Sequence, residues 1–410
     1  MLADDRTVDL VIQRGGEKPA IREALAILLT SEQSHQCAYE TIETEMIDLI
    51  YDELGRKAEP YRSLINRRLR SVLSMNWPVH AHANEILLSD SAKRLRAYLF
   101  VLAAELFHAN REAAVNLSMV YELFHAALLV HDDVMDGAER RRGRDTLHRK
   151  YGVPDAIIAG DLMILKAFGL LADPIHNVAD GQLRQLLAII GETGENCCIG
   201  QSLDMRLAAE RTYERVEEYL HMVEMKTGSL IDGALRGGAV LGDPRPEQVD
   251  RIANMGRNLG TAFQIINDSL DLVGKRANKS VMNDLRQAKA TPMLIYALAH
   301  TGGAEKETLL RAVGNKRLGL PEAERVVNIY RQCGALAWTQ TLSTTYVDRA
   351  RADLHLLPNT PARHRFDEIL DVLGYWGMLS DGDQKLVPAS AARARSSHPA
   401  LPKRGCKSGC

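Results

Sequence analysis

The sequence predicts an all-α protein, and three observations support this fold class. Apolar residues recur at helical spacing over most of the 410 residues. The same segments are rich in Ala, Leu, Met, Glu and Arg, which favour helix. The alternation of apolar and polar residues that marks half-buried strands is scarce. We therefore expect a bundle of helices whose apolar faces meet in one interior.

The helical patterns can be followed along most of the chain. Helices are expected within 17–72, and a turn-rich break follows at Asn76-Trp77-Pro78. Further helical patterns run over about 88–136, 154–172, 182–210, 212–241, 247–274 and 287–300. From residue 386 the chain turns to Ala, Arg, Ser, Pro and Lys without an apolar period, which predicts a disordered tail at 386–410. We expect one all-helical domain at 17–385, preceded by an N-terminal extension at 1–16 whose structure the sequence leaves open.

Charge and composition argue against several classes of protein. The formal net charge is −2, so no nucleic-acid partner is expected and any anion-binding site must be local. Six cysteines, of which Cys197 and Cys198 are adjacent, do not form a disulfide framework, which favours a reducing compartment. The sequence contains no uninterrupted apolar stretch of about 18 residues, so we expect no membrane span. We expect a cytoplasmic protein.

Two aspartates on one helical face form the first candidate site. Asp132 and Asp136 are four residues apart and follow the apolar run 123–130, so both carboxylates project from the same face. Magnesium commonly takes one or two carboxylates plus phosphate oxygens of a substrate. Arginines at 140–142 follow directly, and guanidinium groups suit the remaining oxygens of a metal-bridged polyphosphate. A solvated helix end with surface salt bridges is the alternative interpretation.

A second polar stripe lies more than 130 residues later. Gln264, Asn267, Asp268 and Asp271 are spaced i, i+3, i+4 and i+7 on an otherwise apolar helix. A buried carboxylate needs a partner or a metal ion. Two such stripes on different helices could face each other across a cavity and hold metal ions together.

Basic residues near these stripes suggest anion binding. Lys93 and Arg96 share one face near a helix start, where cations are unfavourable because they oppose the helix dipole. Binding of an anionic ligand would explain their presence there. Lys226-Thr227 interrupts a helical pattern, and Lys279 and Lys289 follow the second stripe. Each lysine alone is typical of a protein surface, so these residues gain meaning only from the two acidic stripes beside them.

The order and spacing of these motifs over about 60–300 resemble the trans-isoprenyl diphosphate synthases of the polyprenyl synthetase family. The matching segments are Ser91–Ala97, Asp132–Asp136, Arg141–Gly143, Gly200–Asp204, Lys226–Gly228, Asn267–Asp271, Lys279 and Asn283–Thr291. The resemblance implies an isoprenoid-synthase-type helical bundle around a central apolar cavity. Three departures stand out: the family's paired glycines are Ser91 and Ala92, its proline is Ala97, and the first Asp of its second motif is Asn267.

The resemblance also implies roles for individual residues. It further implies three Mg²⁺ ions, or Mn²⁺ in their place, that bridge the protein and a diphosphate. The implied metal ligands are Asp132, Asp133, Asp136, Asn267, Asp268 and Asp271. The implied contacts of the allylic diphosphate are Arg141, Lys226, Thr227, Gln264, Lys279 and Lys289. The implied pocket for isopentenyl diphosphate contains Lys93, Arg96, His125 and Arg142. Without the resemblance, His125 could equally be a core histidine.

The implied reaction is a head-to-tail (1′-4) condensation of isopentenyl diphosphate with dimethylallyl, geranyl or farnesyl diphosphate, catalysed by a homodimer. Asp132, Asp136, Arg141, Lys226 and Lys279 would be the catalytic residues. A class I terpene cyclase is one alternative, but its second motif needs Ser or Thr four residues after Asn267 and Glu eight after, where this chain has Asp271 and Lys275. A catalytically weak partner subunit is another, and Asn267 is its only support.

The resemblance extends to product length, because in this family the growing chain runs beside the helix of the first motif. The residues that set its depth there correspond to Ala127 and Leu128, and a small residue at 127 leaves the path open. Phe124 and then Tyr121 follow at steps of three along the same helix. With Phe124 as the floor, the expected product is geranylgeranyl diphosphate. Alternatively, Phe124 packs as ordinary core.

Overall fold

The computed structural model describes residues 35–383 except 76, 90–91, 142–143, 174–175, 177 and 274–281. Side chains are described from residue 50 to 376, apart from those gaps and 270–273. The predicted extension at 1–16 and the predicted tail at 386–410 lie outside the described residues, as do Arg142, Lys279 and the side chain of Asp271.

Helices make up nearly all of the described chain, which confirms the all-α prediction. The first half contains α3 (His35–Val72), α4 (Pro78–Leu87), α5 (Leu95–Leu106), α6 (Arg111–Met135), α7 (Leu147–Tyr151), α8 (Val153–Leu171) and α9 (Asp180–Glu210). The second half contains α10 (Val216–Val223), the π-helix η2 (Glu224–Gly228), α11 (Ser229–Ala239), α12 (Pro246–Val273), α13 (Asn283–Arg286), α14 (Pro292–His300), α15 (Gly303–Ala312), α16 (Leu320–Gln332), α17 (Ala335–His355) and α18 (Pro361–Asp383). Two-residue strands, β1 (Arg140–Arg141) and β2 (Arg144–Asp145), pair antiparallel directly after α6.

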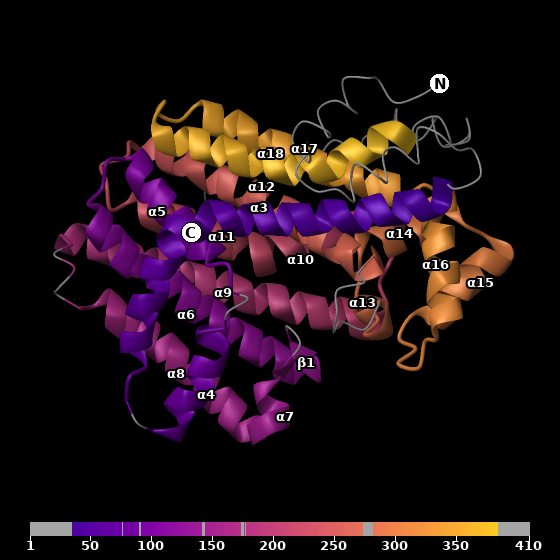
Figure 1. The fold of residues 1–410 in the computed structure, drawn as a ribbon, viewed down its shortest axis with the longest axis horizontal. Coiled ribbons are helices and arrows are strands. Elements are labelled where there is room, and N and C mark those ends of the chain that lie inside the picture. The colour runs from indigo at the N-terminus through magenta and orange to yellow at the C-terminus, as the bar shows by residue number, and fades with distance from the viewer. Residues whose placement is uncertain are drawn as a thin grey trace, which may run out of the picture.

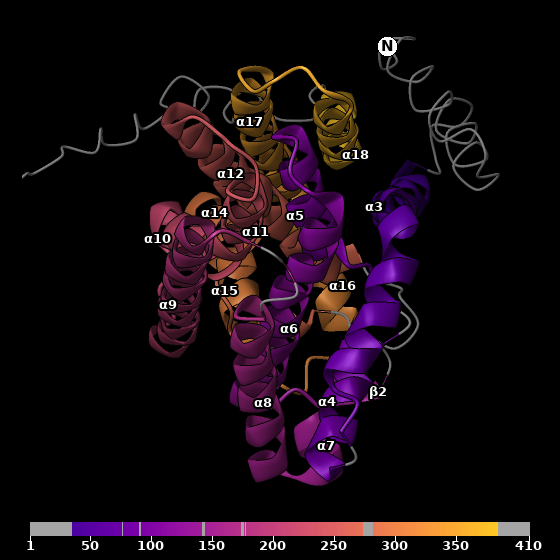
Figure 2. The same cartoon turned by 90° about the vertical axis from the view of Figure 1, so that its left-hand side faces the viewer.

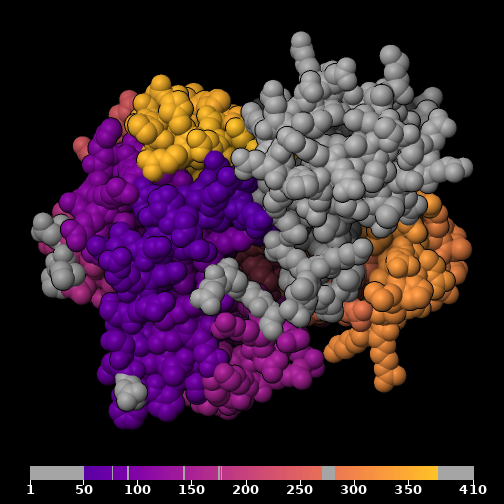
Figure 3. Space-filling view, viewed as in Figure 1, coloured from indigo at the N-terminus to yellow at the C-terminus, as the bar shows by residue number. Residues whose placement is uncertain are grey.

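The helices form a bundle whose middle consists of α5, α6 and α11. In Figure 2, α9, α10 and α12 lie on one side of these helices and α3 on the other. Nearly every residue of α5 and α11 is buried, as expected for helices surrounded on all sides. Along the face shown in Figure 1, α3 runs beneath α17 and α18. The space-filling view shows α15 and α16 as an orange lobe at one end of the same face (Figure 3).

The first acidic motif lies at the end of a long apolar helix. Among the described helices, α6 is the one whose length and hydropathy would suit a membrane span, and 72% of its most apolar window is buried inside the protein. Asn110 begins α6 by accepting a hydrogen bond from the backbone N–H of Ala113. The helix ends at Met135, so that Asp136 is its C-terminal cap residue. The core thus holds the first aspartates in place.

Two predicted helical stretches are divided in the structure. The stretch 88–136 was expected to be continuous, but α5 ends at Leu106 and α6 begins at Arg111, with His108 in a left-handed conformation (φ 59°) between them. The stretch 212–241 is divided into α10, η2 and α11. The apolar pattern continues through the first break, so the pattern did not reveal it. The second break coincides with Lys226-Thr227, the pair that interrupts the helical pattern in the sequence.

Candidate active site

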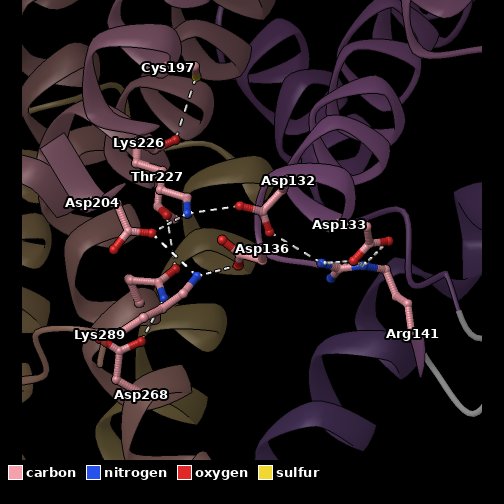
Figure 4. Close-up of polar contacts among 11 residues, drawn as sticks. Asp132, Asp133, Asp136, Arg141, Cys197, Asp204, Lys226, Thr227, Asp268 and Lys289 are labelled. Carbon is pink, nitrogen blue, oxygen red and sulfur yellow. Dashed lines mark hydrogen bonds and ion pairs between the residues drawn. The ribbon is translucent and has the colours of Figure 1, made fainter. Parts of the chain in front are cut away.

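Five charged side chains from four parts of the chain meet in what we call the lysine–aspartate cluster. It contains Asp132 and Asp136 of α6, Asp204 of α9, Lys226 of η2 and Lys289, which lies between α13 and α14 (Figure 4). The Nζ of Lys226 lies 3.1 Å from Asp132 Oδ1 and 2.7 Å from Asp204 Oδ2. The Nζ of Lys289 lies 2.5 Å from Asp136 Oδ2 and 3.4 Å from Asp204 Oδ2. The two lysines therefore link both aspartates of the first motif to α9.

The pKa values of the cluster residues are set by two opposing effects, burial and the neighbouring opposite charges. Burial opposes ionisation of Asp132, but Lys226, Lys289 and Arg141 outweigh it and hold its pKa below the ordinary value. Asp204 shows the same balance, with Lys289 and Lys226 lowering its pKa. At Asp136 burial prevails over Lys289 and raises the pKa. Burial opposes the charge of both lysines as well, and the aspartates overcome it and raise the pKa of each. The lysines thus remain charged because of the neighbouring carboxylates, and Asp132 and Asp204 remain charged because of the lysines.

The donor set of the cluster suits a metal that is held jointly with a substrate. Among the described residues, no group of three or more His, Cys, Asp or Glu side chains could hold a metal ion by itself. Asp132 and Asp136 nevertheless lie one turn apart at the end of α6, and both carboxylates belong to the cluster (Figure 4). Magnesium prefers such oxygen donors and completes its shell with phosphate oxygens and water. The residues present therefore fit Mg²⁺ bound together with a diphosphate.

Asp133 lies apart from the cluster although it belongs to the first motif. Its carboxylate is 2% exposed and accepts hydrogen bonds from Arg141 Nε at 2.8 and 2.9 Å. Burial raises the pKa of Asp133 to about 6, while Arg141 opposes the shift. Arg141 Nη2 also lies 3.3 Å from Asp132. Because Asp133 points to Arg141 (Figure 4), the structure places it as the partner of that arginine and not beside Asp132 and Asp136.

The π-helix η2 directs Lys226 toward the cluster, and small residues allow it to do so. A Cβ on Gly200 of α9 would lie 2.2 Å from the backbone nitrogen of Lys226, so only glycine permits this approach. Cys197, one turn earlier, donates its thiol to the Lys226 carbonyl at 3.5 Å. On the other side, a Cβ on Gly260 of α12 would lie 2.7 Å from the Cα of Gly228. Single π turns often occur at functional sites, and here α9 and α12 fix one from both sides.

The second stripe forms a buried hydrogen-bond network. Asp268 is 8% exposed and accepts hydrogen bonds from Tyr219 Oη at 2.5 Å and from Gln264 Nε2 at 2.7 Å. Thr227 Oγ1 donates to Gln264 Oε1 at 2.9 Å, which joins the network to η2. Burial raises the pKa of Asp268 to about 8, with a further contribution from Asp284. Both carboxylate oxygens of Asp268 are engaged by uncharged groups.

Other members of the stripe are less completely described. Asn267 is half-buried on the same helix, whereas the side chain of Asp271 lies outside the described residues. Lys279, the predicted contact of the allylic diphosphate, also lies outside them. Gln264 and Thr227, predicted to contact the same diphosphate, lie side by side and are hydrogen-bonded to each other.

Of the residues predicted for isopentenyl diphosphate, Lys93 precedes α5, Arg96 lies in its first turn and His125 lies in α6. The Nζ of Lys93 lies 3.9 Å from the centroid of the Tyr51 ring of α3. Burial raises the pKa of the Cys197 thiol to about 12, and the charges of Arg96 and Lys226 both oppose this rise. His125 is half-buried, two turns before Asp132 on α6.

Two functional candidates were missed at the level of sequence. Asp204 was noticed only as the end of the Gly200–Asp204 segment and given no role, yet it accepts hydrogen bonds from both lysines of the cluster. Its signal was a carboxylate four residues after Gly200, on the same face of α9. Tyr219 has no such signal, because a tyrosine among apolar residues is indistinguishable from core. It is fully buried, and its hydroxyl donates to Asp268.

The predicted floor residue Phe124 packs against two neighbouring helices. Its ring meets Phe168 of α8 edge-on, with 6.3 Å between centroids. On α9, a Cβ added to Gly194 would lie 3.1 Å from Phe124 Cζ. Ala127, one turn nearer the first motif, is completely buried, and Leu128 is half-buried.

Tyr121 faces a different part of the bundle. Its ring lies 5.5 Å from that of Phe100 in α5, and its hydroxyl would be 2.8 Å from a Cβ on Gly237 of α11. The stripe formed by residues 121, 124 and 127 therefore turns from α9 toward α11 along α6. This gradual rotation is expected for a step of three residues in a helix with 3.6 residues per turn.

The chain is similar in sequence to a known family of proteins. A family model described as "Polyprenyl synthetase" matches residues 78–330. The short chain isoprenyl diphosphate synthase of Methanothermobacter thermautotrophicus is 31% identical over 314 residues, which are 76% of this chain and 95% of that protein. The geranylgeranyl diphosphate synthase of Saccharolobus solfataricus is 31% identical over 296 residues, or 72% and 89% of the two chains.

The fold is shared with solved structures as well. The crystal structure of geranylgeranyl pyrophosphate synthetase from Pyrococcus horikoshii superposes with a TM-score of 0.71 at 26% identity, covering 79% of this chain and 98% of that one. The family match spans more than half of the 410 residues and includes α6, α9, η2, α12 and Lys289, which carry the site. The chain therefore belongs to the polyprenyl synthetase family.

Proposed function

We propose that this prenyltransferase joins isopentenyl diphosphate head-to-tail (1′-4) to dimethylallyl, geranyl or farnesyl diphosphate, with geranylgeranyl diphosphate as its main product. The observation that carries the proposal is the lysine–aspartate cluster, where Asp132 and Asp136 meet Lys226 and Lys289. A diphosphate leaves as a highly charged anion, and its departure needs cations that are already in position. The cluster provides two ammonium groups and the carboxylates that would hold a metal.

Prenyl diphosphate synthases need a divalent metal, usually Mg²⁺. Asp132 and Asp136 are the residues that would hold it here, and Asn267 and Asp271 remain for a third ion because both oxygens of Asp268 are engaged. When bound, the metal would stabilise negative charge on the leaving diphosphate. Asp204 keeps Lys226 and Lys289 close together, so that both ammonium groups can bind and orient the same diphosphate.

The remaining predicted site residues would bind one or the other of the two substrates. Arg141, held by Asp133, adds a guanidinium group on the side of the allylic diphosphate. Lys93, Arg96 and His125 would bind isopentenyl diphosphate on the adjoining faces of α5 and α6. A carbocation formed between them needs apolar surroundings that exclude water, which the buried face of α6 around Ala127 can provide. The released diphosphate can accept the final proton, so no protein base is needed.

The product length is assigned from Ala127 and Phe124. Ala127 is small and buried and would border the path of the growing chain beside α6. The Phe124 ring one turn away is fixed by Phe168 and by the close backbone of Gly194. A chain growing along α6 would meet Phe124 as a rigid obstacle, since packed interiors resist displacement. We expect Phe124→Ala to lengthen the product and Ala127→Phe to shorten it. Unchanged product distributions in both variants would show that α6 does not limit the chain.

The direct test is product analysis with purified protein. Isopentenyl diphosphate and Mg²⁺ are supplied with each of the three allylic diphosphates, and products are separated by chain length after dephosphorylation. Geranylgeranyl diphosphate is expected from all three. A cyclic hydrocarbon formed without isopentenyl diphosphate would favour a terpene cyclase. Absence of turnover with every substrate would favour the catalytically weak partner subunit, for which Asn267 is the supporting residue.

We further propose that the protein is cytoplasmic and forms a homodimer through α8 and α9. These helices expose several large apolar side chains, and contiguous apolar surface commonly marks an interface. They are Ile157, Ile158, Leu165 and Phe168 of α8 and Leu187, Ile199 and Met205 of α9. Leu165, at 68% exposure, is the best residue to test. Light scattering after size-exclusion chromatography should give a dimer for the natural protein and a monomer for Leu165→Arg.

A further inference from the structure

The start of α5 is fixed by a buried ion pair that has no part in the chemistry described so far. Arg94 precedes α5, Glu122 lies in α6, and each is 4% exposed. Arg94 Nη1 lies 3.3 Å from Glu122 Oε2. Its Nε donates to Asn66 Oδ1 at 2.7 Å, and its Nη2 donates to the carbonyl of Leu87. Arg94 thus links α3, α4 and α6 around the first residue of α5.

The second oxygen of Glu122 reaches α5 itself. Glu122 Oε1 accepts a hydrogen bond from the backbone N–H of Ala97 at 3.1 Å. Ala97 lies in the first turn of α5, where backbone N–H groups have no partner within the helix. No side chain at the helix start provides a cap. Glu122 therefore caps α5 from a neighbouring helix and places a negative charge at its positive end.

This arrangement depends on the residues at positions 97 and 94. Ala97 has a backbone N–H to donate, which a proline at this position would lack. Arg94 adopts a left-handed conformation with φ 57°. Such a conformation is unfavourable for a residue with a side chain. The contacts of Arg94 with Glu122, Asn66 and Leu87 hold it there.

The pair also determines where two cations lie. Lys93 precedes the left-handed residue, and its Nζ lies 3.9 Å from the centroid of the Tyr51 ring of α3. Arg96 follows the left-handed residue in the first turn of α5. Both are at the positive end of α5, which disfavours cations. Glu122 is the buried anion that offsets this repulsion, so the two charges can be held there before any anionic substrate arrives.

We propose that Glu122 is a positioning residue for isopentenyl diphosphate: its buried carboxylate binds Arg94 and the first turn of α5, and thereby fixes Lys93 and Arg96. This inference rests on the proposed function, which assigns Lys93 and Arg96 to that substrate. Glu122 is buried and both of its oxygens are engaged, so it acts through these residues. The allylic diphosphate is bound by α6, η2 and Lys289, so the effect of Glu122 should be selective for the other substrate.

Steady-state kinetics of Glu122→Gln test the selectivity. The substitution keeps the size of the side chain and an oxygen for the Ala97 N–H, but removes the charge. We expect the KM for isopentenyl diphosphate to rise about tenfold, the scale of one charge-assisted hydrogen bond, while the KM for farnesyl diphosphate and kcat stay within about twofold. Glu122→Asp, which restores the carboxylate, should recover part of the loss. An equal change in both KM values, or an unchanged KM for isopentenyl diphosphate, would overturn the proposal.

Asp232→Asn is the matched control. Asp232 is another buried carboxylate, paired with Arg236 at 3.0 Å within α11, and it contacts neither α5 nor Lys93 in the ion pairs of the described residues. Its loss should lower thermal stability as the loss of Glu122 does, without a selective change in either KM. A selective rise in the KM for isopentenyl diphosphate in this control as well would contradict a specific role for Glu122.

Two further measurements keep the test decisive. If Glu122→Gln does not fold, the double variant Glu122→Gln/Arg94→Gln removes both charges and leaves no unpaired buried ion. The same selective rise in KM is then expected, and an unchanged KM overturns the proposal. If the natural protein makes no elongated product, the proposed function fails by itself. Calorimetric titration with isopentenyl diphosphate then tests Glu122 separately: about tenfold weaker binding to Glu122→Gln supports the positioning role, and equal binding refutes it.

Discussion

The two aspartate-rich motifs are similar in sequence, with Asn267 in the place of the first aspartate of Asp132–Asp136, but their surroundings in the structure differ. Asp132 of α6 and Asp268 of α12 each lie on a polar stripe of a largely buried helix. The partners of Asp132 are the cations Lys226 and Arg141, which together with Lys289 lower its pKa against burial. The partners of Asp268 are the uncharged side chains of Tyr219 and Gln264, and burial raises its pKa to about 8.

This difference teaches how a carboxylate becomes available to a metal. A carboxylate balanced by lysine ammonium groups can exchange them for a metal ion, because the lysines can then turn to the phosphate that arrives with it. A carboxylate that accepts two hydrogen bonds from uncharged buried groups would have to leave them unpaired, which is costly. On this reasoning we propose that Asp132 and Asp136 of the first motif bind the metal, while Asp268 of α12 is held by Tyr219 and Gln264.

The largest expected effect comes from removing a carboxylate of the first motif. Asp132→Ala or Asp136→Ala should lower kcat by about three orders of magnitude or more, because the metal and the lysines both lose a partner at the leaving group. Circular dichroism should remain that of a folded helical protein. Glu112→Ala, an exposed carboxylate at the start of the same helix, is the control and should leave kcat unchanged. A kcat within tenfold of the natural protein would refute the assignment.

The next effect concerns how Lys226 reaches the cluster. Gly200→Ala would place a Cβ 2.2 Å from the Lys226 backbone, so η2 must move away from α9. A shift of that kind at a catalytic group should lower kcat by about 10- to 100-fold. Gly191→Ala in the same helix has nothing within 4 Å of its Cβ, and should keep kcat and gain about 0.5–1 kcal/mol of stability. Equal kinetics in the two variants would show that the π turn does not position Lys226.

A smaller effect is expected at the second motif, and it tests the comparison directly. Asp268→Asn replaces a buried carboxyl group by an amide of nearly the same shape that can still accept from Tyr219. We expect kcat to fall by less than about tenfold, since no charged partner is lost. The corresponding change at the first motif, Asp132→Asn, should cost far more. A loss of similar size in both variants, measured at saturating Mg²⁺, would remove the distinction between the two motifs.

The sequence predicted those structural features that are formed within a single helix better than those that depend on contacts between distant segments. The helical period predicted α8 as 154–172 and α12 as 247–274, within one residue of the structure at each end. The two stripes were also predicted, because their spacing is a property of single helices. The break between α5 and α6 was not, since the apolar pattern continues through Leu106 and Phe107 while His108 reverses the backbone.

The rest of the site depends on contacts between distant segments. Lys226 meets Asp132 across 94 residues, and Lys289 meets Asp136 across 153. The sequence indicated an interruption at Lys226-Thr227, but not that it is a π turn, whose path depends on the approach of Gly200 from α9. Asp204 and Tyr219 acquire their roles only from such contacts. Such contacts between distant segments could be predicted only in part from a family resemblance, and not at all from residue spacing within one helix.

The smallest expected effect is a gain rather than a loss. Asn267 provides an amide oxygen where a carboxylate would carry charge, and it lies one residue before Asp268, half-buried on α12. Asn267→Asp adds a negative charge near the cluster, so a third metal ion should bind more tightly. We expect the Mg²⁺ concentration for half-maximal rate to fall several-fold, while kcat at saturating Mg²⁺ changes by less than about twofold, because the first motif already stabilises the leaving group.

The control for this last prediction is a charge added nearby but away from the metals. Asn258→Asp lies on α12 about two and a half turns before Asn267, and its side chain bonds to the backbone carbonyl of Asn254. It should leave the Mg²⁺ dependence unchanged. If both variants lower the Mg²⁺ requirement equally, the effect is one of overall charge. If neither does, position 267 lies outside the metal shell, and α12 contributes to the site only through the network that holds Gln264 and Thr227.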